Sequence, residues 1–246
     1  SPVTHLHIAI PLHDFNAGGT ERIALRLAGQ WAKMGQRVTL LLGAEMGPLR
    51  AAVPDGVDLI TLSPARPRSP TSRLFLGKYM QPVLRQLDPQ AIFLPGNFHF
   101  LLARDLKKAC PNAQMIAKIS NPILPAYIPQ ALGKPLFARI TAGVDRFVAI
   151  GACLAADARP MAAPRPVDVI ADPFLEDDTP ITGRLGHPLA GAGPLHLLCV
   201  GRPEAQKNPD LAFQTVAQLR AQGQAIQFTW LGGSTAERAR LQRRAT

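Results

Sequence analysis

Two cations flank the start of a predicted helix late in the chain. The apolar run over residues 195–200 is short enough for a strand that is buried on both faces. Asn208 suits the N-cap of the next helix, and Pro209 suits its first position. Arg202 and Lys207 therefore lie where free backbone N–H groups and the helix dipole attract anions. A guanidinium beside an ammonium suits a diphosphate, although two solvated surface cations would leave the same pattern.

A pair of glycines follows the first predicted strand, residues 6–12. Gly18 and Gly19 allow backbone conformations that are closed to other residues, and they let a ligand approach the main chain. Thr20 can cap the next helix and Glu21 suits its first turn. An ordinary strand-to-helix turn explains the same residues. The dinucleotide-binding spacing Gly-x-Gly-x-x-Gly and the Walker A pattern are both absent.

Other polar residues are weaker candidates for a site. Asp14 is placed to meet an acceptor hydroxyl, but capping or solvation explains it equally well. His99 follows the predicted strand at 91–94 and is a candidate for an interdomain cleft, whereas a structural histidine is the simpler interpretation. The basic run at 238–244 fits a solvated helix face. No Asp-x-Asp motif is present, so we expect neither a metal ion nor another cofactor.

Strand-like and helix-like segments alternate along the chain. This pattern predicts an α/β fold with parallel, Rossmann-like sheets and right-handed crossovers. Two apolar stripes predict amphipathic helices: Ile23, Leu27, Trp31 and Met34, and then Leu211, Val216 and Leu219. The predicted strands are Leu6–Leu12, Val38–Leu42, Val57–Leu62, Ala91–Leu94, Met115–Ile119, Phe147–Ile150, Val167–Ile170, Leu195–Val200 and Ile226–Leu231.

A segment rich in proline, glycine and acidic residues interrupts this alternation at residues 173–194. We interpret it as a linker between a first domain, residues 1–172, and a second domain, residues 195–246. Only two strands and two helices are predicted after the linker. Such a small set rarely forms a stable core, so we expect an incomplete second domain.

The composition is that of a globular protein, with 47% hydrophobic and 18% charged residues among 246. The three cysteines, Cys110, Cys153 and Cys199, are odd in number and far apart, which favours a reducing compartment over a disulfide framework. No apolar run approaches the roughly 20 residues that span a bilayer, and no signal peptide is evident. We therefore expect a cytoplasmic protein.

The formal net charge is +10, and most of the excess lies early in the chain. Residues 1–172 have a surplus of eight positive charges, with Arg66, Arg68, Arg73 and Lys78 in and after a proline-rich loop. Such a field favours nucleic acid, anionic lipid or phosphorylated small molecules, or merely aids solubility. Few aromatic residues interleave with the basic ones, so we do not expect a nucleic-acid partner.

The glycine loop and the basic loop together match a family. The segments Gly18-Gly19-Thr20-Glu21-Arg22 and Val200-Gly201-Arg202…Lys207-Asn208-Pro209 resemble the GT-B glycosyltransferases of family 4, which are retaining enzymes that use nucleotide-sugar donors. Residues 147–151 and 170–173 also look like family segments, so the resemblance spans nearly the whole chain.

The resemblance implies a donor site. Arg202 and Lys207, with Gly201, would hold the donor diphosphate, and Gly18 and Gly19 would approach the same phosphates from the first domain. Breaking the sugar–phosphate bond builds negative charge on the leaving diphosphate, which fixed cations and backbone N–H groups stabilise without a metal.

Two departures from the family pattern stand out. Many members carry a histidine near the end of the fifth strand, where this chain has Ser120 and Asn121 as candidates for the same hydrogen-bonding role. The family's paired glutamates, eight positions apart, hold the donor ribose and sugar, and this chain lacks them. We therefore expect a fragment that is inactive alone.

The function implied is transfer of a sugar, of the hexosyl type, to an acceptor in envelope polysaccharide, lipopolysaccharide or lipid-linked glycan synthesis. The enzyme would work in the cytoplasm or at the inner face of the membrane, on a saccharide or lipid-linked acceptor. Two alternatives stay open: a nucleotide-sugar epimerase with the same architecture, and a non-catalytic phosphate- or polyanion-binding module.

Overall fold

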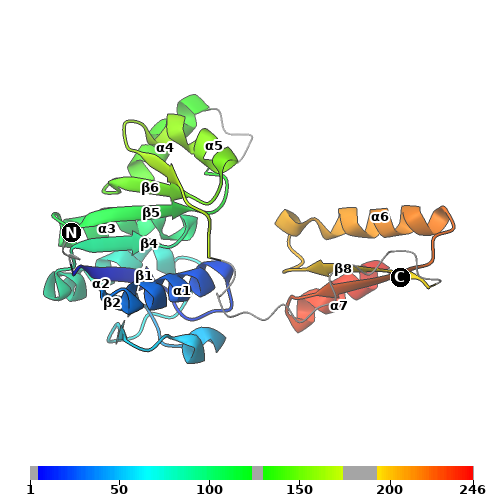
Figure 1. Ribbon diagram of the computed structural model, residues 1–246, viewed down its shortest axis with the longest axis horizontal. Coiled ribbons are helices and arrows are strands. Elements are labelled where there is room, and N and C mark those ends of the chain that lie inside the picture. Colours follow the sequence, from blue (N-terminus) through cyan, green and yellow to red (C-terminus); the bar gives the residue numbers. More distant parts are fainter. Residues whose placement is uncertain (1–4, 124–129, 174–192, 246) are drawn as a thin grey trace. The chain divides into compact units, whose positions relative to one another are not determined.

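The computed structural model describes residues 5–123, 130–173 and 193–245. The chain divides into two compact units, Ser1–Thr179 and Pro180–Thr246, which we call unit 1 and unit 2 (Figure 1). The linker expected over residues 173–194 lies outside the described residues, apart from its ends. None of the helices in the described ranges combines the length and apolar character needed to cross a bilayer.

Unit 1 is built on a seven-stranded parallel sheet in the order β3-β2-β1-β4-β5-β6-β7. The chain winds outward from β1 to one edge and then restarts at β4, so the strand order reverses between β1 and β4. The carboxyl end of this reversal point is where open α/β sheets bind ligands. The strands are β1 His7–Leu12, β2 Arg37–Leu42, β3 Val57–Thr61, β4 Ala91–Leu94, β5 Gln114–Ile119, β6 Arg146–Ala149 and β7 Val167–Val169.

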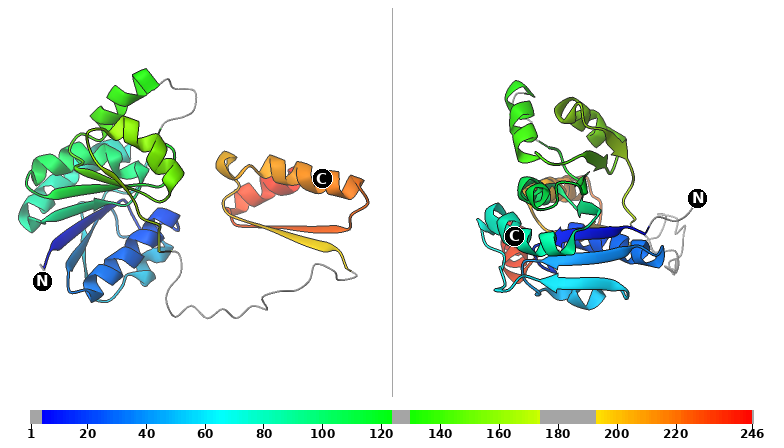
Figure 2. Two further views of the ribbon diagram at one scale, coloured as in Figure 1. Left: turned by 45° about the horizontal axis from the view of Figure 1, so that its top comes forward. Right: turned by 90° about the vertical axis from the view of Figure 1, so that its left-hand side faces the viewer.

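Helices cover both faces of this sheet, as Figures 1 and 2 show. Along β1, Ile8 and Ile10 join the core beneath α1, while Ala9 joins the core on the opposite face, because successive strand side chains point to opposite sides. The helices of unit 1 are α1 Gly19–Lys33, α2 Ser72–Leu87, α3 Ala103–Ala109, α4 Gln130–Ile140 and α5 Ala152–Ala162, with 3-10 turns η1 Pro48–Ala52 and η2 Asn97–Leu102.

Unit 2 holds two parallel strands, β8 Leu195–Val200 and β9 Ile226–Leu231. Its helices are α6 Pro209–Ala221 and α7 Thr235–Ala245, with a short 3-10 turn η3 at Ala205–Lys207. The predicted α/β class is confirmed, and every predicted strand agrees with the structure to within one residue at each end.

The two predicted helical stripes are wrong at single positions. Met34 is the C-cap residue just beyond the end of α1 and is exposed, whereas Ala24 and Ala28 within the helix are buried. Leu211 is exposed on α6, where Val216 makes the buried contact.

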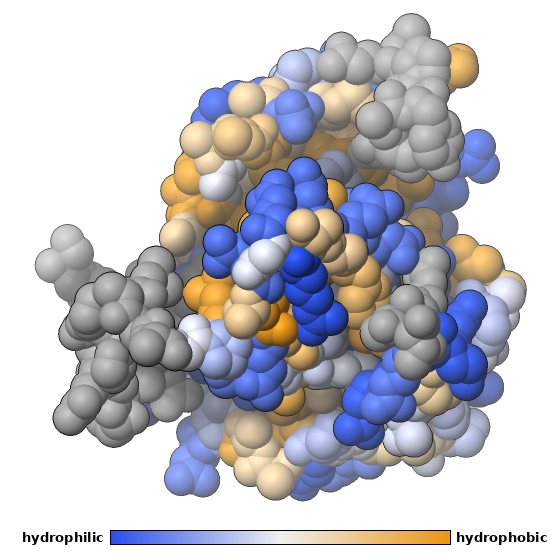
Figure 3. All heavy atoms as spheres, turned by 90° about the vertical axis from the view of Figure 1, so that its right-hand side faces the viewer, coloured by the Kyte–Doolittle hydropathy of each residue, from blue (hydrophilic) through white to orange (hydrophobic). Residues whose placement is uncertain are grey.

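One face of the β8–β9 sheet is open. Burial alternates along β8 and β9, so that Leu198, Val200 and Leu231 are each more than half exposed. Figure 2 shows α6 and α7 on the other side of these strands. On the side of the molecule drawn in Figure 3, apolar residues in orange reach the surface among hydrophilic residues in blue. Unit 2 therefore leaves apolar sheet surface without a covering layer among the described residues.

Candidate functional site

The loop between β8 and α6, residues 201–208, is called the basic loop. It is fixed by close backbone packing at the carboxyl ends of β8 and β9. The Trp230 indole Nε1 donates to the Gly201 carbonyl at 2.8 Å. Gly232 follows β9 with φ +126°, and a Cβ there would overlap the Gly201 carbonyl. Only a glycine accommodates both constraints, so the loops after the two strands lie against each other.

The N-terminus of α6 opens onto this loop, as predicted. The Asn208 side chain accepts a hydrogen bond from the Leu211 amide at 3.2 Å, and Pro209 occupies the first helical position. The cap satisfies the Leu211 amide, and Pro209 has no N–H that would need a partner.

A second helix begins at the same edge of the sheet. Ser234 and Glu237 form a capping box: the Ser234 amide donates to the Glu237 carboxylate at 2.7 Å, and the Glu237 amide donates to Ser234 Oγ at 3.3 Å. The hydrogen bonds from Ser234 lower the pKa of Glu237. We did not predict this cap, although the Ser-x-x-Glu spacing is its usual signal.

Arg202 and Lys207 both lie on the basic loop. The Arg202 guanidinium pairs with the Glu204 carboxylate at 2.8 Å, and both side chains are largely exposed. The Lys207 stem crosses Gly201, since a Cβ on that glycine would lie 3.5 Å from the lysine Cγ and Cε. Both predicted donor-site cations therefore belong to the loop between β8 and α6, where the Glu204 carboxylate competes for Arg202.

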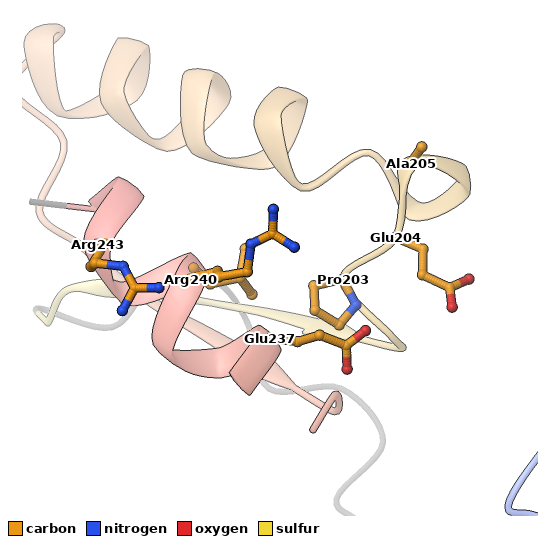
Figure 4. Close-up of a pocket in the computed structure, with 7 residues that line it drawn as sticks. Pro203, Glu204, Ala205, Glu237, Arg240 and Arg243 are labelled. Atoms are coloured by element: carbon orange, nitrogen blue, oxygen red, sulfur yellow. The ribbon is translucent and has the colours of Figure 1, made fainter. Parts of the chain in front are cut away.

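A pocket of about 630 Å³ lies beside the basic loop (Figure 4). Figure 4 shows Arg240 extending from α7 toward the loop that carries Pro203. We expected residues 238–244 to form only a solvated helix face, but Arg240 and Arg243 line this pocket. Because these residues are spaced by three, they lie on the same face of α7 as Glu237. The lining residues are Pro203, Glu204, Ala205, Glu237, Arg240, Leu241 and Arg243.

In unit 1, an arginine ties together the loop that follows β1. Arg68 donates to both oxygens of Asp14, at 2.9 and 2.8 Å, and also to Glu21 at 3.1 Å. Burial raises the pKa of Asp14, but the hydrogen bonds and charge of Arg68 outweigh it and hold that pKa below its usual value. Asp14 is thus a buried, ionised partner of Arg68 rather than a free carboxylate.

Gly18 allows close packing after β1, and neither Gly18 nor Gly19 has a positive φ. Gly18 is the N-cap of α1 with φ −96°, so the expected cap at Thr20 is wrong, and no side chain caps this helix. A Cβ on Gly18 would overlap the Glu21 carboxylate, which folds back over it. A Cβ on Gly19 would meet nothing within 4 Å, so the backbone there is open to a ligand.

The loops after β1, β4 and β5 meet at Gly96. A Cβ on Gly96 would lie 3.0 Å from the Thr20 methyl and 3.5 Å from Ser120 Oγ. The Asn97 side chain holds the two later loops together, because it accepts from the Ser120 amide at 3.0 Å and donates to the Asn121 carbonyl at 2.9 Å. Ser120 and Asn121 therefore lie at the carboxyl edge of the sheet near its reversal point.

Two buried histidines lie in this region of unit 1. His13 Nε2 and His99 Nδ1 are buried and have no hydrogen-bond partner among the described residues. Burial, helped by the nearby Arg68 charge, lowers the pKa of His99 to about 4 and also lowers the pKa of His13. Both rings are therefore neutral at physiological pH, and each keeps one buried nitrogen without a hydrogen-bond partner among the described residues.

The depressed pKa of His99 predicts acid sensitivity of unit 1. Between pH 6.5 and about 4 the unfolded chain binds a proton that folded His99 does not, so stability falls as pH falls through this window. The loss should total about 3 kcal/mol for this group. Urea unfolding of the parent and of His99→Gln over this pH range measures it.

The exposed His5 provides the matched control, as His5→Gln. The control should keep the parent's pH dependence, and His99→Gln should lose about 3 kcal/mol of it. An unchanged slope in His99→Gln would contradict the assignment.

A buried ion pair that we did not predict joins β5 to the segment after β7. Lys118 Nζ contacts both oxygens of Asp172 at 2.8 Å, and the side chains are only 4% and 9% exposed. The sequence did not indicate this ion pair. In the sequence, Lys118 belongs to an apolar strand, and Asp172 belongs to a segment that resembles the family.

No family model and no curated protein matches the chain. Solved structures do match it. HepE from Anabaena, in complex with UDP and glucose, has a TM-score of 0.67 at 13% identity, over 97% of this chain and 64% of that one. The lipopolysaccharide outer core galactosyltransferase WaaB has a TM-score of 0.60 at 14% identity, over 98% of this chain and 65% of that one.

The chain has a GT-B fold. It spans just under two thirds of the length of these GT-B structures. UDP-N-acetylglucosamine 2-epimerase from Rickettsia bellii is also similar, with a TM-score of 0.57 at 13% identity, over 97% of this chain and 64% of that one. The GT-B fold is thus shared by proteins with different activities.

Proposed function

We propose that this chain is part of a retaining glycosyltransferase of family 4, which transfers a hexosyl group from a UDP-sugar to a saccharide or lipid-linked acceptor of the cell envelope. The observation that carries the proposal is the basic loop of unit 2, with Arg202 and Lys207 in the segment that connects β8 to α6. That HepE binds UDP and WaaB is a galactosyltransferase supports the choice of donor.

The donor diphosphate is the group that this loop suits. As the sugar–phosphate bond breaks, negative charge grows on the leaving diphosphate, and two neighbouring cations stabilise it. Arg202 is paired with Glu204, so the phosphate must displace or share that carboxylate. No metal ion enters this proposal, and chelation with EDTA should leave transfer unchanged.

The acceptor is assigned to the carboxyl edge of the unit 1 sheet, where the strand order reverses. Ser120 and Asn121 lie there, and His99, whose ring is buried, lies in η2 after β4. Asp14 acts through Arg68 by holding the loop that leads to Gly18 and Gly19. The backbone at Gly19 is the open part of that loop.

We further propose that the 246-residue chain does not catalyse transfer alone. The apolar face of β8 and β9 is uncovered at Leu198, Val200 and Leu231. A two-stranded sheet with such a face needs further structure to be stable in water. The purified chain should therefore show no transfer with any donor and acceptor pair that a completed protein accepts.

The epimerase neighbour motivates a second candidate function. The experiment that separates the two is incubation of UDP-sugars with a protein in which this chain is joined to a complete second domain. A transferase releases UDP only when an acceptor is present and builds a glycosidic product. An epimerase returns an inverted sugar without an acceptor, and binding without either product assigns a non-catalytic phosphate-binding module.

A further inference from the structure

Helix α2 presents an unusual surface to solvent. Its inner side, with Leu76, Met80 and Leu84, is buried in the core of unit 1. Its outer side carries large apolar residues that are about half exposed, at Leu74 and Phe75 among others. A surface helix of a monomeric protein normally carries polar residues on its outer side. The exposed apolar residues of α2 therefore indicate a binding surface.

Cations accompany the exposed rings. The Arg66 guanidinium lies 3.8 Å from the centre of the Tyr79 ring, and the Lys78 ammonium lies 5.9 Å from that of Phe75. The Arg73 guanidinium lies 5.3 Å from the centre of the Phe98 ring, which belongs to η2. Each ring thus has a positive group beside it at the surface.

Helix α2 has no acidic residue that would offset its positive charges. The sequence of α2 contains Arg73, Lys78 and Arg85 and not a single acidic residue. Arg68, which the sequence placed among these cations, is paired with Asp14 and Glu21, whose negative charges offset its positive charge. The positive charge at α2 therefore comes from its own residues and from Arg66.

We propose that this surface binds the headgroup region of an anionic phospholipid bilayer. We call it the lipid face. Amphipathic rings with neighbouring cations suit the membrane interface, where rings sit at headgroup level and cations meet lipid phosphates. Leu74 adds an aliphatic contact that base stacking would not use, which favours lipid over single-stranded nucleic acid. The lipid face consists of Arg66, Arg73, Leu74, Phe75, Lys78, Tyr79 and Phe98.

The lipid face lies next to the carboxyl edge of β4. Phe98 comes two residues after Gly96, where the loops after β1, β4 and β5 meet. A lipid-linked molecule in the bilayer would therefore be presented beside that edge. The inference itself rests on the surface of α2 and η2 and does not require the proposed transfer activity.

Sedimentation with sucrose-loaded vesicles tests the proposal on the whole chain. Vesicles of equal parts phosphatidylglycerol and phosphatidylcholine should bind the protein, and vesicles of phosphatidylcholine alone should not. Binding should weaken as salt rises. Arg73→Glu with Lys78→Glu should lower the partition coefficient more than about tenfold, since each basic residue near an anionic surface contributes roughly fivefold. Phe75→Ser with Tyr79→Ser should lower it at unchanged charge.

The matched control reverses two exposed lysines elsewhere in unit 1, as Lys33→Glu with Lys134→Glu. Its net charge equals that of the first variant, so the control separates a local face from a general field, and circular dichroism verifies the fold of each protein. In Phe75→Trp, the added tryptophan emission should shift to the blue on anionic vesicles. Absence of binding to anionic vesicles at low salt overturns the proposal. So does equal loss in the control, or binding of a single-stranded oligonucleotide without vesicle binding.

Discussion

Replacing Arg202 or Lys207 by alanine is expected to cost about 2–4 kcal/mol of transition-state stabilisation each, the scale of losing one preorganised donor. Both residues lie in the loop that connects β8 to α6, where we propose that the diphosphate gains charge as the sugar leaves. The effect should appear as slower transfer by a protein that joins this chain to a complete second domain. Steady-state rates with a UDP-sugar donor measure it.

The matched control is Arg238→Ala, which removes one exposed positive charge from α7 outside the residues that line the pocket. Its rate should stay within about twofold of the parent, because an exposed cation away from the phosphates stabilises little. Equal rates for the parent, Arg202→Ala and Lys207→Ala would remove the basis for the diphosphate assignment.

Lys118→Met is expected to destabilise unit 1 by about 3–5 kcal/mol, because it leaves the Asp172 carboxylate buried without its partner. Replacing both residues by uncharged groups of similar shape, Lys118→Met with Asp172→Asn, should recover much of the loss, since no lone buried charge then remains. Urea unfolding followed by circular dichroism gives the free energies.

The exposed pair between Arg146 and Asp168 supplies the comparison within the same sheet. Arg146→Met should cost no more than about 1 kcal/mol, as surface ion pairs usually do. Similar losses in the free energy of unfolding for Lys118→Met and Arg146→Met would contradict the prediction that burial makes the Lys118–Asp172 pair the more important one for stability.

The sequence predicted the strands well because each is a short apolar run, such as Leu195–Val200, that no other element imitates. The helices were predicted less well in detail. Met34 continues the spacing of an apolar stripe, but α1 ends at Lys33, and burial there depends on the small residues that let the helix approach the sheet. The spacing of apolar residues in the sequence does not show how closely a helix approaches the sheet.

The candidate site likewise has local features that the sequence predicted and long-range contacts that it did not. The cap at Asn208 is local chemistry, so residue types within one turn were enough to predict it. The partners of Asp14 and Asp172 are 54 residues away in the chain, and only the folded sheet brings Arg68 and Lys118 to them. Arg240 likewise reaches the basic loop only because β8 and β9 are neighbours.

The central claim is that the basic loop of unit 2 binds a nucleotide diphosphate. Titration of UDP into the isotope-labelled chain, followed by amide NMR shifts, tests it most directly, with inorganic pyrophosphate as a second probe. We expect saturable shifts at Gly201, Arg202, Lys207 and the first turn of α6, which Arg202→Ala should weaken about tenfold or more and Arg238→Ala should leave unchanged. Shifts that avoid this loop, or that are equal in Arg202→Ala and the parent, would contradict the account.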